Sequence, residues 1–145
     1  MNNDIDIAKK LLGEDSSITL AVVNKKKTFV SRERGIKPIF SLYKNDPEFL
    51  FGASVADKVT GRASAFVLVA GGVVVLHSGI ISEKAFEVLK EANITVTFDK
   101  QVDCIINRTG DGICPMEQAT KGCYTPSDAI NAIEKKLYEL SKKQV

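Results

Sequence analysis

The segment 112–117 reads Gly-Ile-Cys-Pro-Met-Glu and holds the residue best suited to nucleophilic chemistry. Pro115 is favoured at the first position of a helix, so Cys114 is predicted to lie at a helix N-terminus. There the helix dipole and the free backbone N–H groups stabilise a thiolate, the reactive form of cysteine. Cys114 is therefore the predicted nucleophile, and the alternative is a small buried hydrophobe. For Cys104 and Cys123 the buried, structural interpretation is kept.

Two carboxylates are the predicted proton carriers. Ser54 and Asp57 form an S-x-x-D pattern that resembles a capping box and predicts a helix over 54–71. Asp57 could then act as a general base or accept a hydrogen bond from a hydroxyl or amine of a ligand. Glu117, one turn into the second helix, has the same two roles. For both residues the alternative is an acid that caps its own helix.

Residues next to these carboxylates are predicted to bind a ligand. Lys58 and Arg62 are four apart, so on one helix they share a face and could hold a phosphate or a carboxylate. The alternative is a pair of solvated charges. Gly61 removes a side chain from the same helix at a cost of roughly 1 kcal/mol, which indicates the close approach of a strand or a ligand. The other predicted ligand-binding residues are Asn107 and Arg108 after a strand, Gly112 in a glycine-rich loop, and Met116.

The elements that must position these residues follow from apolar periodicity, caps and turns. Their order predicts an α/β protein: a three-layer α/β/α sandwich with a mixed sheet. Ligands of such sheets collect at the carboxyl ends of the strands, beside helix N-termini. The expected helices cover 4–12, a short segment from Pro38, 54–71, a segment from Ser82, and a C-terminal segment capped by Thr125. The expected strands cover 18–23, 28–31, 73–76, 94–98 and 102–106.

Composition restricts the class of protein. The 145 residues suit one domain, 1–145, and the hydrophobic fraction of 44% is that of an ordinary globular protein. A net charge of +2 gives no basic surface for nucleic acid, so no nucleic-acid partner is expected. The longest apolar run is too short and interrupted to span a membrane. Without a signal-peptide pattern, and with three cysteines lacking C-x-x-C spacing, the protein is expected in the cytoplasm. The edge strand 94–98 makes a homo-oligomer a further expectation.

Two motifs carry a resemblance to known proteins. Residues 56–63 fit A-D-K-V-x-G-K/R-A, and residues 112–117 fit G-I-C-P-M-E. With these motifs the chain resembles the cytidine-deaminase-like superfamily, and within it a small bacterial family of unknown function. The resemblance implies a cytidine-deaminase-like fold and a nucleoside- or nucleotide-like ligand.

The residues at the positions that correspond to zinc ligands in this superfamily argue against zinc as a cofactor. Zinc deaminases carry H/C-A-E at one helix start and P-C-x-x-C at another. The corresponding metal positions here are Val55, Cys114 and Glu117, with Asp57 in place of the catalytic glutamate. Valine cannot ligate zinc, and two protein ligands are fewer than the three that catalytic zinc needs. No cofactor is therefore expected.

Three functions remain open. The first is a protein that binds a small, nucleotide-like molecule and has a metal-independent activity that depends on Cys114. The second is a non-catalytic ligand-binding or regulatory module that kept the pocket. The third is a zinc-dependent nucleoside deaminase, which the missing zinc ligands disfavour.

Overall fold

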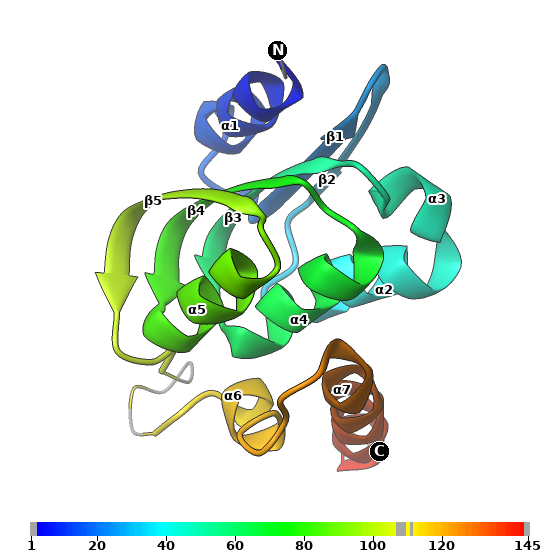
Figure 1. Ribbon diagram of the computed structural model, residues 1–145, viewed down its shortest axis with the longest axis vertical. Coiled ribbons are helices and arrows are strands. Elements are labelled where there is room, and N and C mark those ends of the chain that lie inside the picture. Colours follow the sequence, from blue (N-terminus) through cyan, green and yellow to red (C-terminus); the bar gives the residue numbers. More distant parts are fainter. Residues whose placement is uncertain (1–2, 107–109, 111, 144–145) are drawn as a thin grey trace.

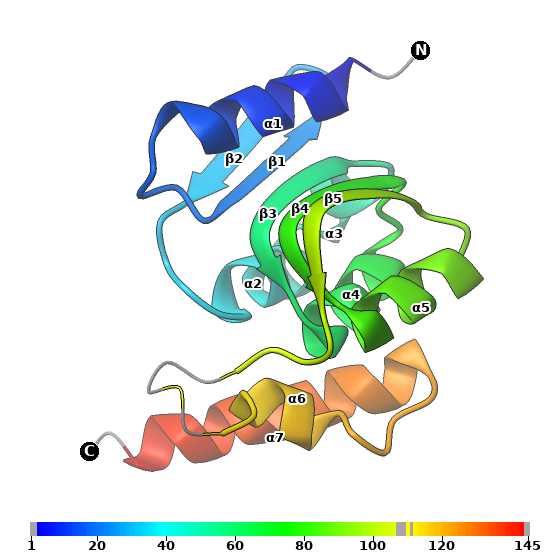
Figure 2. The ribbon, with the colours of Figure 1, turned by 90° about the vertical axis from the view of Figure 1, so that its left-hand side faces the viewer.

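The computed structural model describes residues 3–106, 110 and 112–143, so the predicted ligand-binding residues Asn107 and Arg108 lie outside the described residues. The elements alternate between helices and strands for most of the chain, as Figures 1 and 2 show. The helices are α1 (Asp4–Glu14), α2 (Lys37–Asn45), α3 (Pro47–Leu50), α4 (Arg62–Gly71), α5 (Glu83–Glu91), α6 (Pro115–Ala119) and α7 (Pro126–Lys143). The strands are β1 (Leu20–Asn24), β2 (Lys27–Ser31), β3 (Ser54–Thr60), β4 (Val75–Ser82) and β5 (Thr95–Val102).

The five strands form one mixed sheet in the order β2-β1-β3-β4-β5. The hairpin strand β1 is antiparallel to both of its neighbours, whereas β3, β4 and β5 run parallel. Since parallel strands end at the same edge, the carboxyl ends of β3, β4 and β5 lie together with the starts of α4 and α5. The α/β class and the mixed sheet are thus confirmed.

Helices cover both faces of the sheet. On one face α1 buries Ala8 against Ala21, Val23 and Ala56. On the other face α2, α4 and α5 pack over the main core, and α6 and α7 lie beyond α4 (Figure 2). Helix α4 is therefore covered from two sides, which explains why its sequence is apolar around most of its circumference. No helix of the described ranges is long and apolar enough to cross a membrane.

The prediction of a helix over 54–71 was wrong in its first half. Residues Ser54–Thr60 form the central strand β3, and α4 begins only at Arg62. Gly61, the residue before the helix, has an extended conformation with φ −97° and ψ 179°. The Ser54-x-x-Asp57 pattern is therefore no capping box. The backbone N–H and C=O groups of this segment pair with β1 and β4 and so are not available for helical hydrogen bonds.

Two predicted strands also differ from the structure. Strand β4 starts at Val75 and runs to Ser82, which extends beyond the expected 73–76. Strand β5 takes Thr95–Val102, and residues 103–106 form no strand; Ile106 makes only an isolated bridge to Ile113. The predicted caps are confirmed at two helices. Ser82 accepts a hydrogen bond from the N–H of Ala85, and Thr125 accepts one from the N–H of Asp128.

Candidate functional site

Asp57 lies within β3, where it pairs with Leu20 of β1 and Ser78 of β4. Its Oδ2 lies 3.4 Å from the Thr60 hydroxyl, which lies 2.9 Å from the Ser78 hydroxyl. Burial raises the pKa of Asp57 from 3.8 to about 7, against the opposing hydrogen bonds of the Val59 N–H and the Thr60 hydroxyl. A carboxyl with this pKa exchanges its proton near neutral pH, which is the property that a general base needs.

Glu117 joins α6 to the start of α4. Its carboxylate accepts a hydrogen bond from the backbone N–H of Arg62, the first residue of α4. In return the Arg62 guanidinium donates to the backbone carbonyl of Glu117 at 3.0 Å. Glu117 is buried, and this burial raises the pKa of its carboxyl, while the N–H and the charge of Arg62 oppose the rise. Glu117 thus stabilises the N-terminus of a helix other than its own.

Gly61 is required by this junction. A Cβ on Gly61 would lie 2.2 Å from Glu117 Oε1 and 3.2 Å from Ile105 Cγ1. The sequence predicted the close approach of a strand or a ligand to a glycine inside a helix, whereas the structure shows a side chain of α6 at a glycine that precedes α4. The glycine, Arg62 and Glu117 form one unit, which we call the α4–α6 junction.

The cysteines lie in three different environments. Cys114 occupies the N-cap position of α6, at the helix N-terminus as predicted, without a side-chain capping hydrogen bond, and its partly buried side chain packs against the main core. Its backbone N–H donates to Ile105 O at 3.0 Å. No hydrogen bond joins Cys114 to Asp57 among the described residues. Cys104 is exposed, so the prediction that it is buried was wrong, and Cys123 lies partly buried between α6 and α7.

A groove of about 570 Å³ opens between α4, α5 and the segment that connects α6 to α7. Three cationic side chains line it: Arg62 from α4, Lys84 from α5 and Lys121. The Arg62 Nε atom is buried, and no described group accepts a hydrogen bond from it. Tyr124, which is 90% exposed, stands at the groove together with Phe66, Glu87 and the thiol-bearing Cys123.

Among the predicted site residues that the structure describes, Arg62 alone lines this groove. Lys58 lies in β3, not on the helix of Arg62, and its ammonium donates to the carbonyl of Ser16; the prediction of a shared helix face was wrong. Met116 is buried in the main core, and Gly112 is exposed before α6. The groove residues Lys84, Lys121, Cys123 and Tyr124 were missed, since only the packing of α5 and the α6–α7 connection on α4 brings them together.

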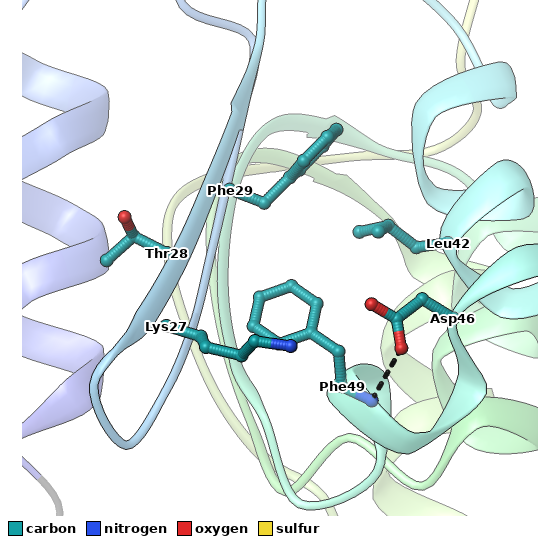
Figure 3. Close-up of a pocket in the computed structure, with 6 residues that line it drawn as sticks. All are labelled: Lys27, Thr28, Phe29, Leu42, Asp46 and Phe49. Atoms are coloured by element: carbon teal, nitrogen blue, oxygen red, sulfur yellow. Dashed lines mark hydrogen bonds between the residues drawn. The ribbon is translucent and has the colours of Figure 1, made fainter.

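A smaller hollow of about 150 Å³ lies between the β1–β2 hairpin and α2 and α3, shown in Figure 3. Its polar groups are already engaged with the protein. The Asp46 carboxylate accepts from the N–H of Phe49 at 3.4 Å, and the Lys27 ammonium lies 5.8 Å from the centre of the Phe49 ring. None of the predicted site residues that the structure describes lines this hollow, so the larger groove is the better candidate for a ligand site.

Metal-binding groups do not converge in the described part of the chain: no cluster of three His, Cys, Asp or Glu side chains is found there. His77 instead takes part in a polar contact between strands. Its Nδ1 lies 2.8 Å from the Thr97 hydroxyl, and its Nε2 lies 3.6 Å from the Asp99 carboxylate. Burial is the main cause that lowers the pKa of His77.

Comparison with known proteins places the chain in a family. The model of the TM1506 family, described as a domain of unknown function (DUF1893), matches residues 7–137. The chain belongs to this family. A crystal structure of a DUF1893 family protein (TM1506) from Thermotoga maritima superposes with a TM-score of 0.84 at 25% sequence identity. The match covers 94% of this chain and 91% of that protein. No curated protein matches the sequence.

Proposed function

We propose that this DUF1893 protein binds a small anionic molecule with an aromatic ring, such as a nucleotide, in the groove between α4, α5 and the α6–α7 connection. The observation that carries the proposal is the buried Arg62 Nε, which has no acceptor among the described residues, on a side chain that lines a groove of about 570 Å³. This volume lies within the roughly 300–1,000 Å³ of small-molecule sites. A buried N–H that lacks a partner is costly, and a shift of the Arg62 side chain toward the groove would let an anionic oxygen of a ligand accept from it.

The other groove residues suit the remaining parts of such a ligand. Lys84 and Lys121 add positive charge for a phosphate or carboxylate, although Lys84 also lies 3.5 Å from the Glu87 carboxylate. The exposed ring of Tyr124 offers a surface on which an aromatic base can stack. The carboxylates of Glu87 and Glu91 can accept hydrogen bonds from amino groups of a base.

The groove is a different place from the catalytic site predicted at Cys114. Cys114, Asp57 and Glu117 do not line the groove, whereas Cys123 does. The geometry therefore favours a binding or regulatory module over a Cys114-dependent enzyme. The helix-flanked mixed sheet is compatible with the cytidine-deaminase-like fold that the sequence resembles, and this finer assignment is part of the proposal, as is the nucleotide-like class of the ligand.

Calorimetric titration with a panel of nucleoside monophosphates and diphosphates, together with adenosine and inorganic phosphate, tests the proposal. We expect at least one nucleotide to bind and to raise the melting temperature by mass action. Tyr124→Ala should weaken that binding by about tenfold, since stacking of a base on an aromatic ring contributes ~1–3 kcal/mol. Tyr138→Ala is the matched control, because Tyr138 is 60% exposed on α7 and does not line the groove.

A second readout locates the ligand. Bound nucleotide should slow the alkylation of Cys123, which lines the groove, and leave that of the exposed Cys104 unchanged. If no member of the panel binds, or if Tyr124→Ala and Tyr138→Ala bind equally well, the proposed function is wrong.

A further inference from the structure

The outer edge of β5 is the longer of the two free edges of the sheet. β5 contributes eight residues and pairs on one side with β4, and no other described strand lies on its far side (Figure 1). The opposite edge, β2, has only five residues. An unpaired strand presents a row of N–H and C=O groups that can pair with another strand.

An apolar side chain stands in the middle of this edge. Phe98 is 37% exposed, and the ring of Phe86 on α5 holds it edge-to-face, with ring centres 5.7 Å apart. In β4, the neighbour of β5, Ile80 is also 37% exposed. Fixed aromatic side chains on open backbone edges favour pairing with another strand, because cross-strand aromatic pairs stabilise sheets.

We propose that a second copy of this chain pairs with the β5 edge, antiparallel, with Phe98 of both copies at the two-fold axis. An axis perpendicular to the sheet keeps the helices of both copies on the same side, so opposite residues must belong to the same face. One residue of β5 therefore lies on the axis, opposite the same residue of the second copy. The side-chain charges decide which residue this is.

Like charges exclude two of the central registers. Centring on Asp99 places two carboxylates opposite each other, and centring on Lys100 places two ammonium groups there. Centring on Thr97 avoids this repulsion but pairs only residues 95–99 of β5. Centring on Phe98 pairs residues 95–101, places Phe98 opposite Phe98, and sets Val96 opposite Lys100 of the second copy.

The dimer leaves the proposed ligand groove open. The groove is lined by Lys84, Val88 and other residues of α5, while Phe86 of the same helix faces β5. Self-association is therefore independent of the proposed function, and either can fail without the other.

Sedimentation velocity over a range of protein concentrations tests the dimer. We expect a concentration-dependent dimer in the wild-type protein, and Phe98→Lys should raise its dissociation constant at least about tenfold by placing two cations at the axis. Val30→Lys on β2 is the matched control, because Val30 is 36% exposed on the other edge strand. A monomer at every concentration, or a dimer that Phe98→Lys leaves intact, overturns the proposal.

Two further variants test the register and do not depend on the Phe86 contact. Thr97, which is exposed, lies opposite Asp99 of the second copy in this register. Thr97→Lys should strengthen the dimer, since it sets an ammonium opposite that carboxylate, and Thr97→Glu should weaken it. With all three native cysteines changed to serine, Phe98→Cys should form a disulfide-linked dimer under mild oxidation, and Val30→Cys should not. Equal cross-linking of both cysteine variants, or equal effects of the two Thr97 variants on the dimer, contradicts the register.

Discussion

Two carboxyl groups in the described part of the chain, those of the buried Glu117 and the partly buried Asp57, have pKa values raised by burial but have different partners. Glu117 accepts a hydrogen bond from the backbone N–H of Arg62, and the positive charge of Arg62 favours its ionised form. Asp57 has neutral donors only: the hydroxyl of Thr60 and the N–H groups of Val59 and Lys58. Burial raises the pKa of both carboxyls.

Burial alone therefore does not determine what a carboxylate does in this protein. Glu117 holds two helices together, because its acceptor atom fills a place at a helix start that Gly61 leaves empty. Asp57 lies in β3, between β1 and β4, and its hydrogen bonds from the Val59 N–H and the Thr60 hydroxyl are long, at 3.4 Å, so its surroundings act mainly on its ionisation. Glu117 is therefore a structural acid, and Asp57 is an acid whose charge depends on pH.

The largest expected effect concerns the α4–α6 junction. Gly61→Ala places a methyl group 2.2 Å from Glu117 Oε1 and should lower the free energy of unfolding by on the order of 2–3 kcal/mol. Urea denaturation measures this change. Gly13→Ala is the matched control: nothing lies within 4 Å of a Cβ there, and in α1 the alanine should stabilise by up to about 1 kcal/mol. Equal changes in the free energy of unfolding for the two substitutions would contradict a steric clash at Gly61.

The next effect separates the acceptor atom of Glu117 from its charge. Glu117→Ala removes the acceptor of the Arg62 N–H and should cost about 1–2 kcal/mol of unfolding free energy. Glu117→Gln keeps an acceptor oxygen and should cost less. In a double-mutant cycle, Gly61→Ala should cost less in the Glu117→Ala background, because the clashing carboxylate is gone. Purely additive effects would show that the two residues do not meet.

A further effect of similar size concerns Asp57 and appears in the pH dependence. The pKa is higher in the folded state than in the unfolded chain, so the folded state binds more protons between pH 4 and about 7. The free energy of unfolding should therefore fall as the pH rises through this window. Asp57→Asn should flatten the fall and raise stability at pH 8 by on the order of 1–2 kcal/mol. An unchanged pH profile of the variant, measured by thermal unfolding, would mean that Asp57 ionises normally.

Local sequence signals predicted the elements that local contacts stabilise. Thr125 with Pro126 marked the start of α7, and Ser82 marked the start of α5, because a cap bonds to residues two or three positions away. The hairpin was predicted for the same reason. These signals depend on neighbours along the chain, so a sequence contains them in full.

In the segment 54–60 the local signals predicted the wrong element. Its Ser54-x-x-Asp57 pattern and small residues favour a helix start, but the segment lies between β1 and β4, which pair with it on both sides. Tertiary pairing overrides local propensity there. The groove was missed for a related reason, since Arg62, Lys84 and Tyr124 come from three separate segments. For Gly61 the sequence predicted a close approach, and only the structure shows that Glu117 makes it.

The position of α4 between the sheet and α7 has a consequence for the way the chain folds during synthesis. The sheet and α4 can form early, but the far side of α4 packs against α7, which is made last among the described elements. At about 5–20 residues per second, the ribosome leaves that apolar surface uncovered for several seconds. Nascent chains therefore pass through a stage at which a nearly complete α/β sheet still carries an open hydrophobic face, a surface that molecular chaperones bind.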